Sequence, residues 1–408
     1  MNTATTTHWK EMKLGDVAEK IAMGPFGSNI KVETFVKEGI PVISGAHLRG
    51  VKLEDNGYNF VSVEHANRLA SANVKRGDVV FTHAGNIGQV SYIPKSSKYE
   101  RYILSQRQFY LRPDTKQLSS EYLAYYFISP IGHHQLMTYA NQVGVPSIAQ
   151  PVTNLRTTEV LLPPLEEQKS IVDVFLSLDN KIELLQKQNE TLEQIAQAIF
   201  NERFTKKGDE LPKGWRVGTL GEVVEAKGGS TPSTKNEEFW GGSISWSSPK
   251  DLSDNKGTFL LHTQNTITEK GLSQISSGLL PSGTLLLSSR APIGYLAITA
   301  IPLAINQGYI AINSLGVWSN YFTYLWLKKN MQLVMASSNG STFMEISKSS
   351  FRAIETVLPD DKEVLDFDSI ITPLFLKILH NIKEIETLAT TRDVLLPRLM
   401  SGELIATN

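Results

Sequence analysis

The four residues LGDV at positions 14–17 return as LGEV at positions 220–223, 206 residues further along the chain. GDVV at 77–80 returns as GTLL at 283–286 with the same offset. Toward the end of each copy the offset falls to 196 residues, which indicates small deletions in one copy. This period is far longer than that of solenoid repeats, so each copy is a whole domain. The sequence therefore predicts two similar modules with divergent interiors.

Composition places the chain among globular proteins. Its 408 residues are 41% hydrophobic and 20% charged, which is enough for two or three domains with cores of their own. The absence of cysteine excludes disulfide frameworks and cysteine-based zinc sites, and fits a reducing compartment. Residues 1–10 are polar, and no apolar run reaches the roughly 18 residues that a membrane span needs. We expect a soluble cytoplasmic protein.

Charge is unevenly distributed along the chain, although the total is only −1. Residues 1–160 carry a net +4 and residues 211–360 a net +2, whereas residues 161–210 carry −4 and residues 361–408 carry −3. Two mildly basic modules thus alternate with acidic segments. So small an excess is equally compatible with contact to DNA and with an ordinary solvated surface.

Both modules, 1–160 and 208–358, show a mixed α/β pattern. Short apolar stretches such as GIPVI at 39–43 are bounded by glycine and proline, as is typical of strands. An aromatic-rich helix is expected near residues 120–127, with its copy near residues 320–326. We expect these aromatic rings to pack in the module cores. The fold class is therefore α/β, with an internal repeat.

A long helix is predicted over residues 165–205, within a segment at 161–207 that has a different pattern. Seam positions there alternate in steps of four and three, as in a coiled coil. Asn189 occupies one of these positions, where a buried asparagine fixes helix register at a cost in stability. The apolar residues expected to pack along this seam are Ile171, Phe175, Leu178, Ile182, Leu185, Leu192 and Ile199.

The segment at 359–408 carries the same seam. Pro373 is expected either to kink this second helix or to begin a second segment, and Gly402 to end it. Two equivalent seams in one chain most simply pack on each other. Because the second helix must return toward the first module, the pair should be antiparallel and related by a pseudo-two-fold axis. Its expected packing residues are Ile371, Leu374, Ile378, Ile385, Leu388 and Leu395.

Two similar modules held apart by helices are suited to two functions. They can read two half-sites on duplex DNA, as dimeric regulators do. They can equally form a scaffold that joins two protein-binding modules. The arrangement itself does not distinguish these two functions.

Several short motifs, in their order and duplication, carry a resemblance to a known family. They are GPFGS at 24–28, GVPSI at 144–148, LPPLEEQ at 162–168, GGSTP at 228–232, FWGG at 239–242 and RDVLLPRLMSGEL at 392–404. Over nearly its whole length the chain resembles the specificity (S) subunit of type I restriction-modification systems, the HsdS family.

The resemblance implies a non-catalytic subunit that acts in DNA methylation and host defence. Residues 1–160 and 208–358 would be target recognition domains, each reading one half of a split sequence in double-stranded DNA. The helical spacers at 161–207 and 359–408 would dock two methyltransferase subunits, and restriction subunits would join that core. S-adenosylmethionine would bind to the methyltransferase partner, and this chain would carry no cofactor or metal.

Motifs for catalysis are missing from the sequence, in agreement with that implication. The chain has neither the Asn-Pro-Pro-Tyr/Phe motif of adenine methylation nor a Walker A loop. The alternatives from a different class are a two-headed interaction scaffold that does not bind DNA and a stand-alone DNA-binding regulator.

Base readout uses Arg or Lys for guanine and Asn or Gln for adenine, so the candidates are residues of these types in the predicted loops of the modules. The alternative for each candidate is that it is a surface charge or a turn residue and does not contact DNA. In the first module the candidates are Lys31, Arg49, Lys75, Arg76, Asn86, Arg107, Gln108, Asn141 and Gln142. In the second they are Lys235, Lys250, Lys256, Arg290, Asn306, Gln307, Asn339 and Lys348.

Overall fold

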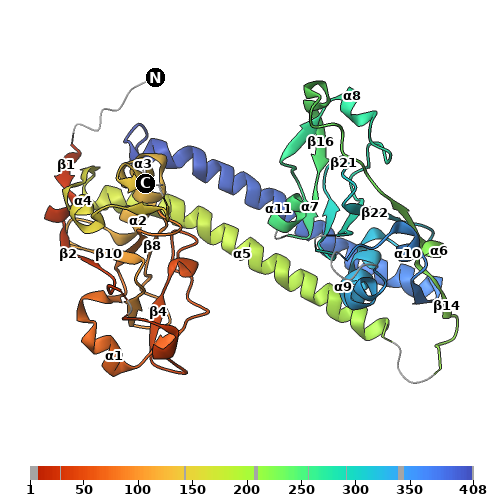
Figure 1. Cartoon of the computed structure of the whole chain (residues 1–408), viewed down its shortest axis with the longest axis horizontal. Helices are drawn as coiled ribbons and strands as arrows, with labels where there is room; N and C mark the ends of the chain where they lie inside the picture. The colour runs from red at the N-terminus through yellow and green to blue at the C-terminus, as the bar shows by residue number, and fades with distance from the viewer. Residues whose placement is uncertain are drawn as a thin grey trace. The chain divides into compact units, whose positions relative to one another are not determined.

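The computed structural model describes residues 8–27, 29–141, 144–205, 210–255, 257–290, 292–338 and 344–406. The chain forms two compact units, one made of Met1–Lys181 with Leu388–Asn408 and the other of Ile182–Thr387 (Figure 1). These differ from the four segments expected from sequence, because each long helix is divided between the two units.

The described residues of the first unit form two larger sheets, a closing strand pair and a short two-stranded hairpin. The pair joins β1 (Lys10–Lys13) to β13 (Glu159–Leu162) in antiparallel fashion. One sheet has the order β2-β10-β7-β8, with the bounds Ala18–Met23, Gln108–Pro113, Val79–Thr82 and Val90–Tyr92. The other has the order β3-β5-β4-β9-β6, with the bounds Phe35–Val36, Phe60–Val61, Ile40–Ile43, Arg101–Leu104 and Asn73–Lys75.

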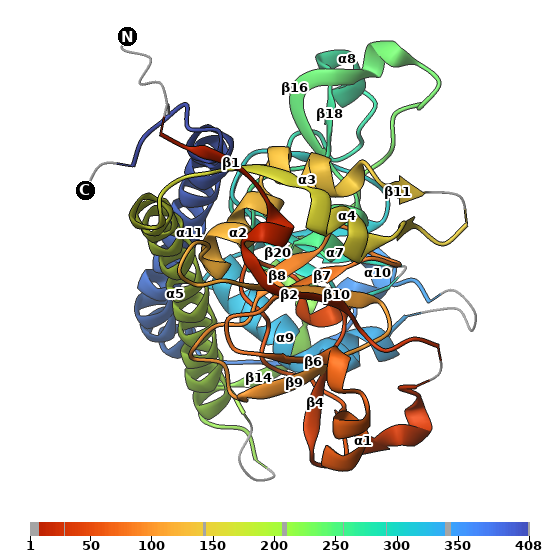
Figure 2. The same ribbon diagram turned by 90° about the vertical axis from the view of Figure 1, so that its left-hand side faces the viewer.

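Helices cover the first of these sheets and join it to the long helices. The aromatic side chains of α2 (Ser120–Ile128) are buried, as predicted, in one core with the sheet and with the long helices. Figure 2 shows α2 beside the long helices. The remaining elements are α1 (Val63–Arg68), α3 (Pro130–Met137), β11 (Ala140–Asn141), β12 (Ser147–Ile148) and α4 (Pro151–Thr157). Short 3-10 turns lie at η1 (Leu14–Asp16), η2 (Val32–Thr34), η3 (Gly45–His47) and η4 (Ala70–Ala72).

The second unit repeats this plan. Its closing pair joins β14 (Arg216–Thr219) to β23 (Glu355–Leu358). The main sheet, β15-β22-β19-β20-β17, has the bounds Val224–Lys227, Tyr309–Ser314, Leu285–Ser288, Leu296–Thr299 and Phe259–Leu260. The smaller sheet, β18-β16-β21, has the bounds Asn265–Ile267, Trp240–Ser247 and Ala304–Ile305. The shorter helices are α6 (Leu220–Val223), η5 (Glu237–Phe239), α7 (Pro249–Asp254), α8 (Glu269–Leu272), α9 (Asn320–Ala336) and α10 (Lys348–Arg352).

Strand register confirms the duplication. Gln108 of β10 pairs with Thr82 of β7, and Tyr309 of β22 pairs with Ser288 of β19 in the same place. Each module contains an equivalent parallel pair, β4 with β9 and β16 with β21, and the second module has a further parallel pair, β17 with β20. The internal repeat seen in the sequence is therefore a repeat of topology as well.

The long helices α5 (Leu165–Arg203) and α11 (Asp361–Met400) run antiparallel in each unit, as predicted. In the first unit, Asp179 of α5 contacts Arg392 of α11. In the second unit, the ring centroid of Phe200 lies 5.7 Å from that of Phe367, and Asn189 contacts Asn381. Residue numbers therefore rise along α5 in the direction in which they fall along α11.

The predicted seam residues are all at least partly withdrawn from solvent. Ile171, Phe175, Leu185, Ile371 and Ile378 are buried. The half-buried ones are Leu178, Ile182, Leu192, Ile199, Leu374, Ile385, Leu388 and Leu395.

Pro373 lies inside α11, so the expectation that it begins a second segment is wrong. A proline removes the hydrogen bond to the carbonyl four residues earlier, here that of Ser369. Ser369 is exposed, so its carbonyl remains open to water. Gly402 follows the helix end in a left-handed conformation, with a φ of 72°. No helix in the described part of the chain has the length and apolar character of a membrane span.

Asn381 is fully buried between the helices and makes a polar contact at the seam. Its Nδ2 donates to Gln188 Oε1 and Asn189 Oδ1, each at 2.8 Å, while its own Oδ1 is buried and has no hydrogen-bond partner among the described residues. A buried asparagine of this kind allows one register and disfavours others, because a slipped register leaves its amide unpaired.

We expect Asn381→Leu to raise the thermal stability of the helix pair and to loosen its register. The chain has no cysteine, so spin labels can be placed on cysteines substituted at Lys187 and Lys383 without background. The distance distribution should be narrow in the parent chain and broad or multimodal in Asn381→Leu. Lys377→Leu, at an exposed position of the same helix, is the control. Equally narrow distributions in all three proteins would contradict a register role.

Candidate nucleic-acid interface

In the first module, the carboxyl ends of the parallel strands β4 and β9 bring several loops together. Ser44 follows β4 and Ser105 follows β9, and the Ser105 amide donates to the Ile43 carbonyl at 2.8 Å. The β7–β8 turn lies beside them and contains Gly85 and Gly88, each with a φ of 85°. Glycine adopts this left-handed conformation without strain, which allows a tight turn here.

Two neighbouring hollows are formed by these loops and share Ser44, Ala46 and Ser105. One, of about 280 Å³, is lined by the predicted residues Asn86, Arg107 and Gln108, together with Gln89 and Thr82. The other, of about 400 Å³, is lined by the predicted Lys31 and by His47, Asn59 and Gln106. The fold therefore gathers four predicted candidates from three separate parts of the sequence.

Gln108 corrects one of the predicted base contacts. Its side chain is 1% exposed, because strand β10 is covered on both sides at this position. Its side-chain Oε1 accepts a hydrogen bond from Ser105 Oγ, and its Nε2 donates to Thr82 Oγ1 at 3.4 Å. Thr82 Oγ1 in turn donates to Gln89 Oε1 at 3.3 Å. Gln108 therefore supports the floor of the smaller hollow and does not present an edge to a base.

Other predicted residues of the first module lie elsewhere. Lys75 and Arg76 precede β7, at the opposite end of that strand from the hollow, and Arg76 donates to the Ser97 carbonyl at 2.6 Å. The side chain of Arg49 lies 3.8 Å from Glu54 and is exposed.

The 140–148 hairpin brings another candidate to the turn that carries Asn86. Asn141 of β11 pairs with Ser147 of β12, and Ser147 also bridges to Ala84. Gln142 lies outside the described residues.

His47 and Gln89 were missed by the sequence reasoning. The His47 ring stacks on Tyr58 with centroids 4.4 Å apart, and its Nδ1 accepts from the Ser44 amide at 3.0 Å. Burial lowers the pKa of His47, despite hydrogen bonds that act in the opposite direction, so the ring is neutral at pH 7. Neither residue has a local signal, because the neighbours that make it relevant arrive through strand pairing.

The second module assembles an equivalent cluster after β16 and β21. Lys250 lies in α7, which follows β16, and Asn306 follows β21, with its amide donating to the Ser247 carbonyl at 3.0 Å. Gln307 Oε1 accepts from Thr231 Oγ1 at 2.6 Å. Arg290, which follows β19, lies 3.9 Å from Glu345.

Other candidates of the second module are placed as follows. Lys348, on α10, lies beside Gly228, where an added Cβ would be 3.3 Å from its side chain. Lys235 is exposed in the loop before η5. Lys256 and Asn339 lie outside the described residues.

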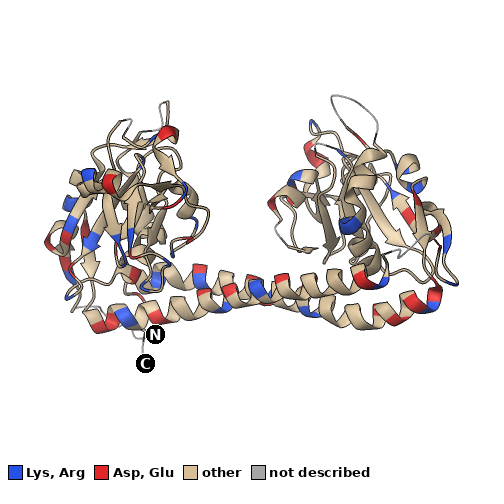
Figure 3. Cartoon of the chain, turned by 90° about the horizontal axis from the view of Figure 1, so that it is seen from below, with Lys and Arg blue, Asp and Glu red and all other residues tan. Residues whose placement is uncertain are grey.

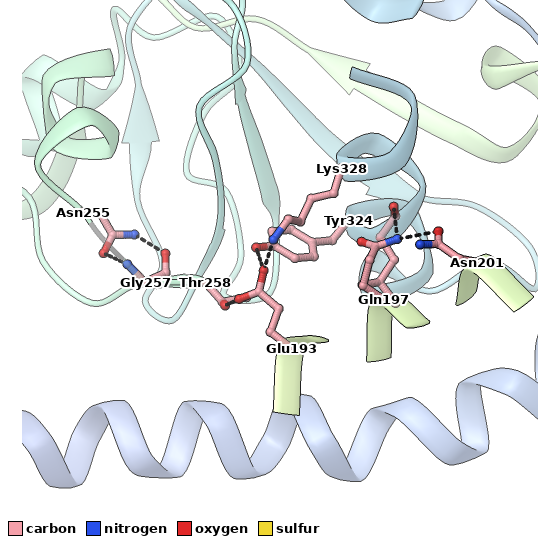
Figure 4. A network of polar contacts seen from close by, with 9 residues as sticks. Glu193, Gln197, Asn201, Asn255, Gly257, Thr258, Tyr324 and Lys328 are labelled. Atoms are coloured by element: carbon pink, nitrogen blue, oxygen red, sulfur yellow. Dashed lines mark hydrogen bonds and ion pairs between the residues drawn. The ribbon is translucent and has the colours of Figure 1, made fainter. Parts of the chain in front are cut away.

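A carboxylate of α5 attaches each module to the helix pair. In the first unit, Asp179 accepts from Tyr125 at 2.5 Å and from Arg392 at 2.8 Å. In the second unit, Glu193 accepts from Thr258 Oγ1 at 2.7 Å and from Tyr324 at 2.8 Å, and it also contacts Lys328 (Figure 4).

The family model for the type I restriction modification DNA specificity domain matches residues 7–194 and 212–391. The MjaIX specificity subunit of Methanocaldococcus jannaschii is 42% identical over 156 residues, which are 38% of this chain and 36% of that protein. The HindI specificity subunit of Haemophilus influenzae is 23% identical over 97% of this chain and 99% of its own length.

A solved structure shows that the fold is shared over the full length. The S subunit of a type I restriction-modification system from M. genitalium matches with a TM-score of 0.60 and 16% identity, covering 98% of each chain. The family model accounts for both modules and most of both long helices. The chain therefore belongs to the family of type I restriction-modification specificity subunits.

Proposed function

We propose that this chain is the DNA-reading subunit of a type I restriction-modification complex and that each module reads one half of a split target. The observation that carries the proposal is the duplicated loop cluster. Both modules place polar side chains at the carboxyl ends of a parallel strand pair. The scaffold is the same, but the side chains differ, as two different half-sites require.

The chemistry of the clusters suits duplex DNA. Arg107 and Asn86 in one module, and Lys250 and Gln307 in the other, are residue types that bond base edges or phosphates. The other basic residues of the modules would contact phosphates, which fix orientation without reading sequence. The two modules together would then specify two short half-sites with an unread spacer between them.

The helices α5 and α11 would dock two methyltransferase subunits. Charged residues of both signs alternate along them (Figure 3), and several apolar side chains off the seam are exposed. These are Leu184, Ile195, Leu365, Ile370, Leu376 and Val394. The methyltransferase would bind S-adenosylmethionine and methylate adenine, restriction subunits would join the complex, and this chain would perform no chemistry itself.

We expect the double variant Leu184→Glu with Leu376→Glu to weaken copurification of the methyltransferase subunits by about tenfold to a hundredfold. The two side chains are 61% and 53% exposed, so they do not support the fold of this chain. Burying a leucine at an interface contributes roughly 1.5–3 kcal/mol. Glu190→Gln, at an exposed position of α5 near Leu184, is the control. Unchanged copurification would exclude these side chains from the interface.

Native long-read sequencing of host DNA, with the gene intact and deleted, tests the function itself. Loss of a split methyladenine motif on deletion is the expected result, and it would reveal both half-sites. An unchanged methylome in a host that expresses the chain would contradict the proposal and favour a scaffold.

A further inference from the structure

The smaller hollow of the first module presents hydrogen-bond donors without acceptors opposite them. Thr82 donates to Gln89 Oε1, so the Gln89 amide is oriented and its Nε2 remains a donor. Among the interactions of the described residues, neither Gln89 Nε2 nor the Arg107 guanidinium has a hydrogen-bond or ion-pair partner. The guanidinium lies over Gly85, where an added Cβ would be 3.1 Å from its Nη1.

The floor beneath these donors is fixed. Ser105, Gln108, Thr82 and Gln89 form one continuous chain of hydrogen bonds. Gln108 is fully withdrawn from solvent, so this chain is anchored in the module core. Gln89 is thus held in place by a bonded neighbour, as a specific contact requires.

The second module lacks these donors at the equivalent positions. Thr82 and Ser288 are equivalent, because the Thr82 amide donates to the Gln89 carbonyl and the Ser288 amide donates to the Tyr295 carbonyl. Gln89 therefore corresponds to Tyr295. Gln108 pairs with Thr82, and Tyr309 pairs with Ser288, so Gln108 is equivalent to Tyr309. Gly308 of the second module is therefore the equivalent of Arg107.

We propose that Arg107 and Gln89 read a guanine in the half-site of the first module, an inference that rests on the proposed function. In the major groove guanine presents two acceptors, N7 and O6, whereas adenine pairs an acceptor with an amino donor and cytosine presents an amino donor. The two unpaired donors of Arg107 and Gln89 match the two acceptors of guanine and oppose the amino groups of adenine and cytosine. The half-site of the second module is read by different chemistry, since Gly308 and Tyr295 occupy these places.

The test replaces the host gene with Arg107→Ala, Arg107→Gln and Gln89→Leu alleles and sequences native DNA. Methylated fractions are sorted by the base pair at each position of the motif. With Arg107→Ala, discrimination at one G·C position of one half-site should fall by about tenfold to a hundredfold. Gln89→Leu should weaken it at the same position, and the other half-site should stay unchanged.

Lys95→Ala is the matched control, because it removes one exposed positive charge from the same module. Lys95 follows β8 near Asp78, whose carbonyl accepts from the Ile93 amide, so it lies at the far end of the sheet from the hollow. Its motif should equal that of the parent chain.

Two outcomes would overturn the proposal. One is a full motif with parental discrimination in Arg107→Ala. The other is a uniform loss of methylation, whatever the base pair, in both Arg107 variants, which would assign Arg107 to a phosphate. Either result is distinct from failure of the proposed function, in which the parent gene itself produces no split motif.

Discussion

Phe200→Ala should lower the free energy of unfolding of the second unit by about 3–5 kcal/mol. Phe200 is 1% exposed on α5, and its ring centroid lies 5.1 Å from that of Phe322 on α9 and 5.7 Å from that of Phe367 on α11. Removing the ring leaves a cavity between three helices that cannot collapse independently. The expected change is measured by urea unfolding followed by tryptophan fluorescence.

Ile195→Ala is the matched control for Phe200→Ala. Ile195 lies on the same helix and is 44% exposed, so its truncation should cost far less. If both variants lost similar stability, burial of the Phe200 ring would not account for the loss, and Phe200 would not join the module to the helices.

Glu193→Gln should destabilise the second unit by about 2–3 kcal/mol at pH 7. The carboxylate accepts from Thr258 and Tyr324 and contacts Lys328, so it joins α5 to the sheet and to α9. The neutral amide loses the charge that Lys328 faces, and it cannot accept at both of its former oxygen positions. Glu190→Gln, at an exposed position of the same helix, should leave stability almost unchanged.

The effect of Glu193 should depend on pH in a defined direction. Burial alone would raise the pKa of Glu193, but hydrogen bonds from Lys328 and Thr258 outweigh burial and lower it. The folded-state pKa is therefore below that of the unfolded chain, about 4.3. The stabilisation is complete above that value and is lost as the pH falls through the folded-state pKa. The stability difference between the parent chain and Glu193→Gln should shrink accordingly, and a difference that grew in acid would contradict this account.

The two long helices show how much of the fold can be predicted from the local sequence pattern. Seam residues such as Phe175 and Ile378 recur at steps of three and four, and this periodicity places them on one helix face before any partner is known. Their burial follows from that periodicity. Pro373 marks the limit of such reasoning, because its effect depends on whether the carbonyl it frees faces water, and the sequence pattern alone did not reveal that.

The site was less accessible to sequence reasoning. Arg107 and Asn86 were identified by residue type and by loop position, but Gln108, chosen in the same way, is buried. Gln89 was passed over, although it faces the same hollow. These differences depend on which end and which face of a strand a residue occupies once distant strands pair.

By itself, the sequence determined the duplication, the α/β modules, the antiparallel helix seams and the family, because these are expressed in local periodicity and in repeated motifs. Only the tertiary structure decided which loops converge, as with Ser44 and Ser105 at the ends of two strands that are parallel neighbours. It also decided that Glu193 attaches the second module to α5. Such contacts join residues that are tens to more than a hundred positions apart, and they exist only when the chain has closed on itself.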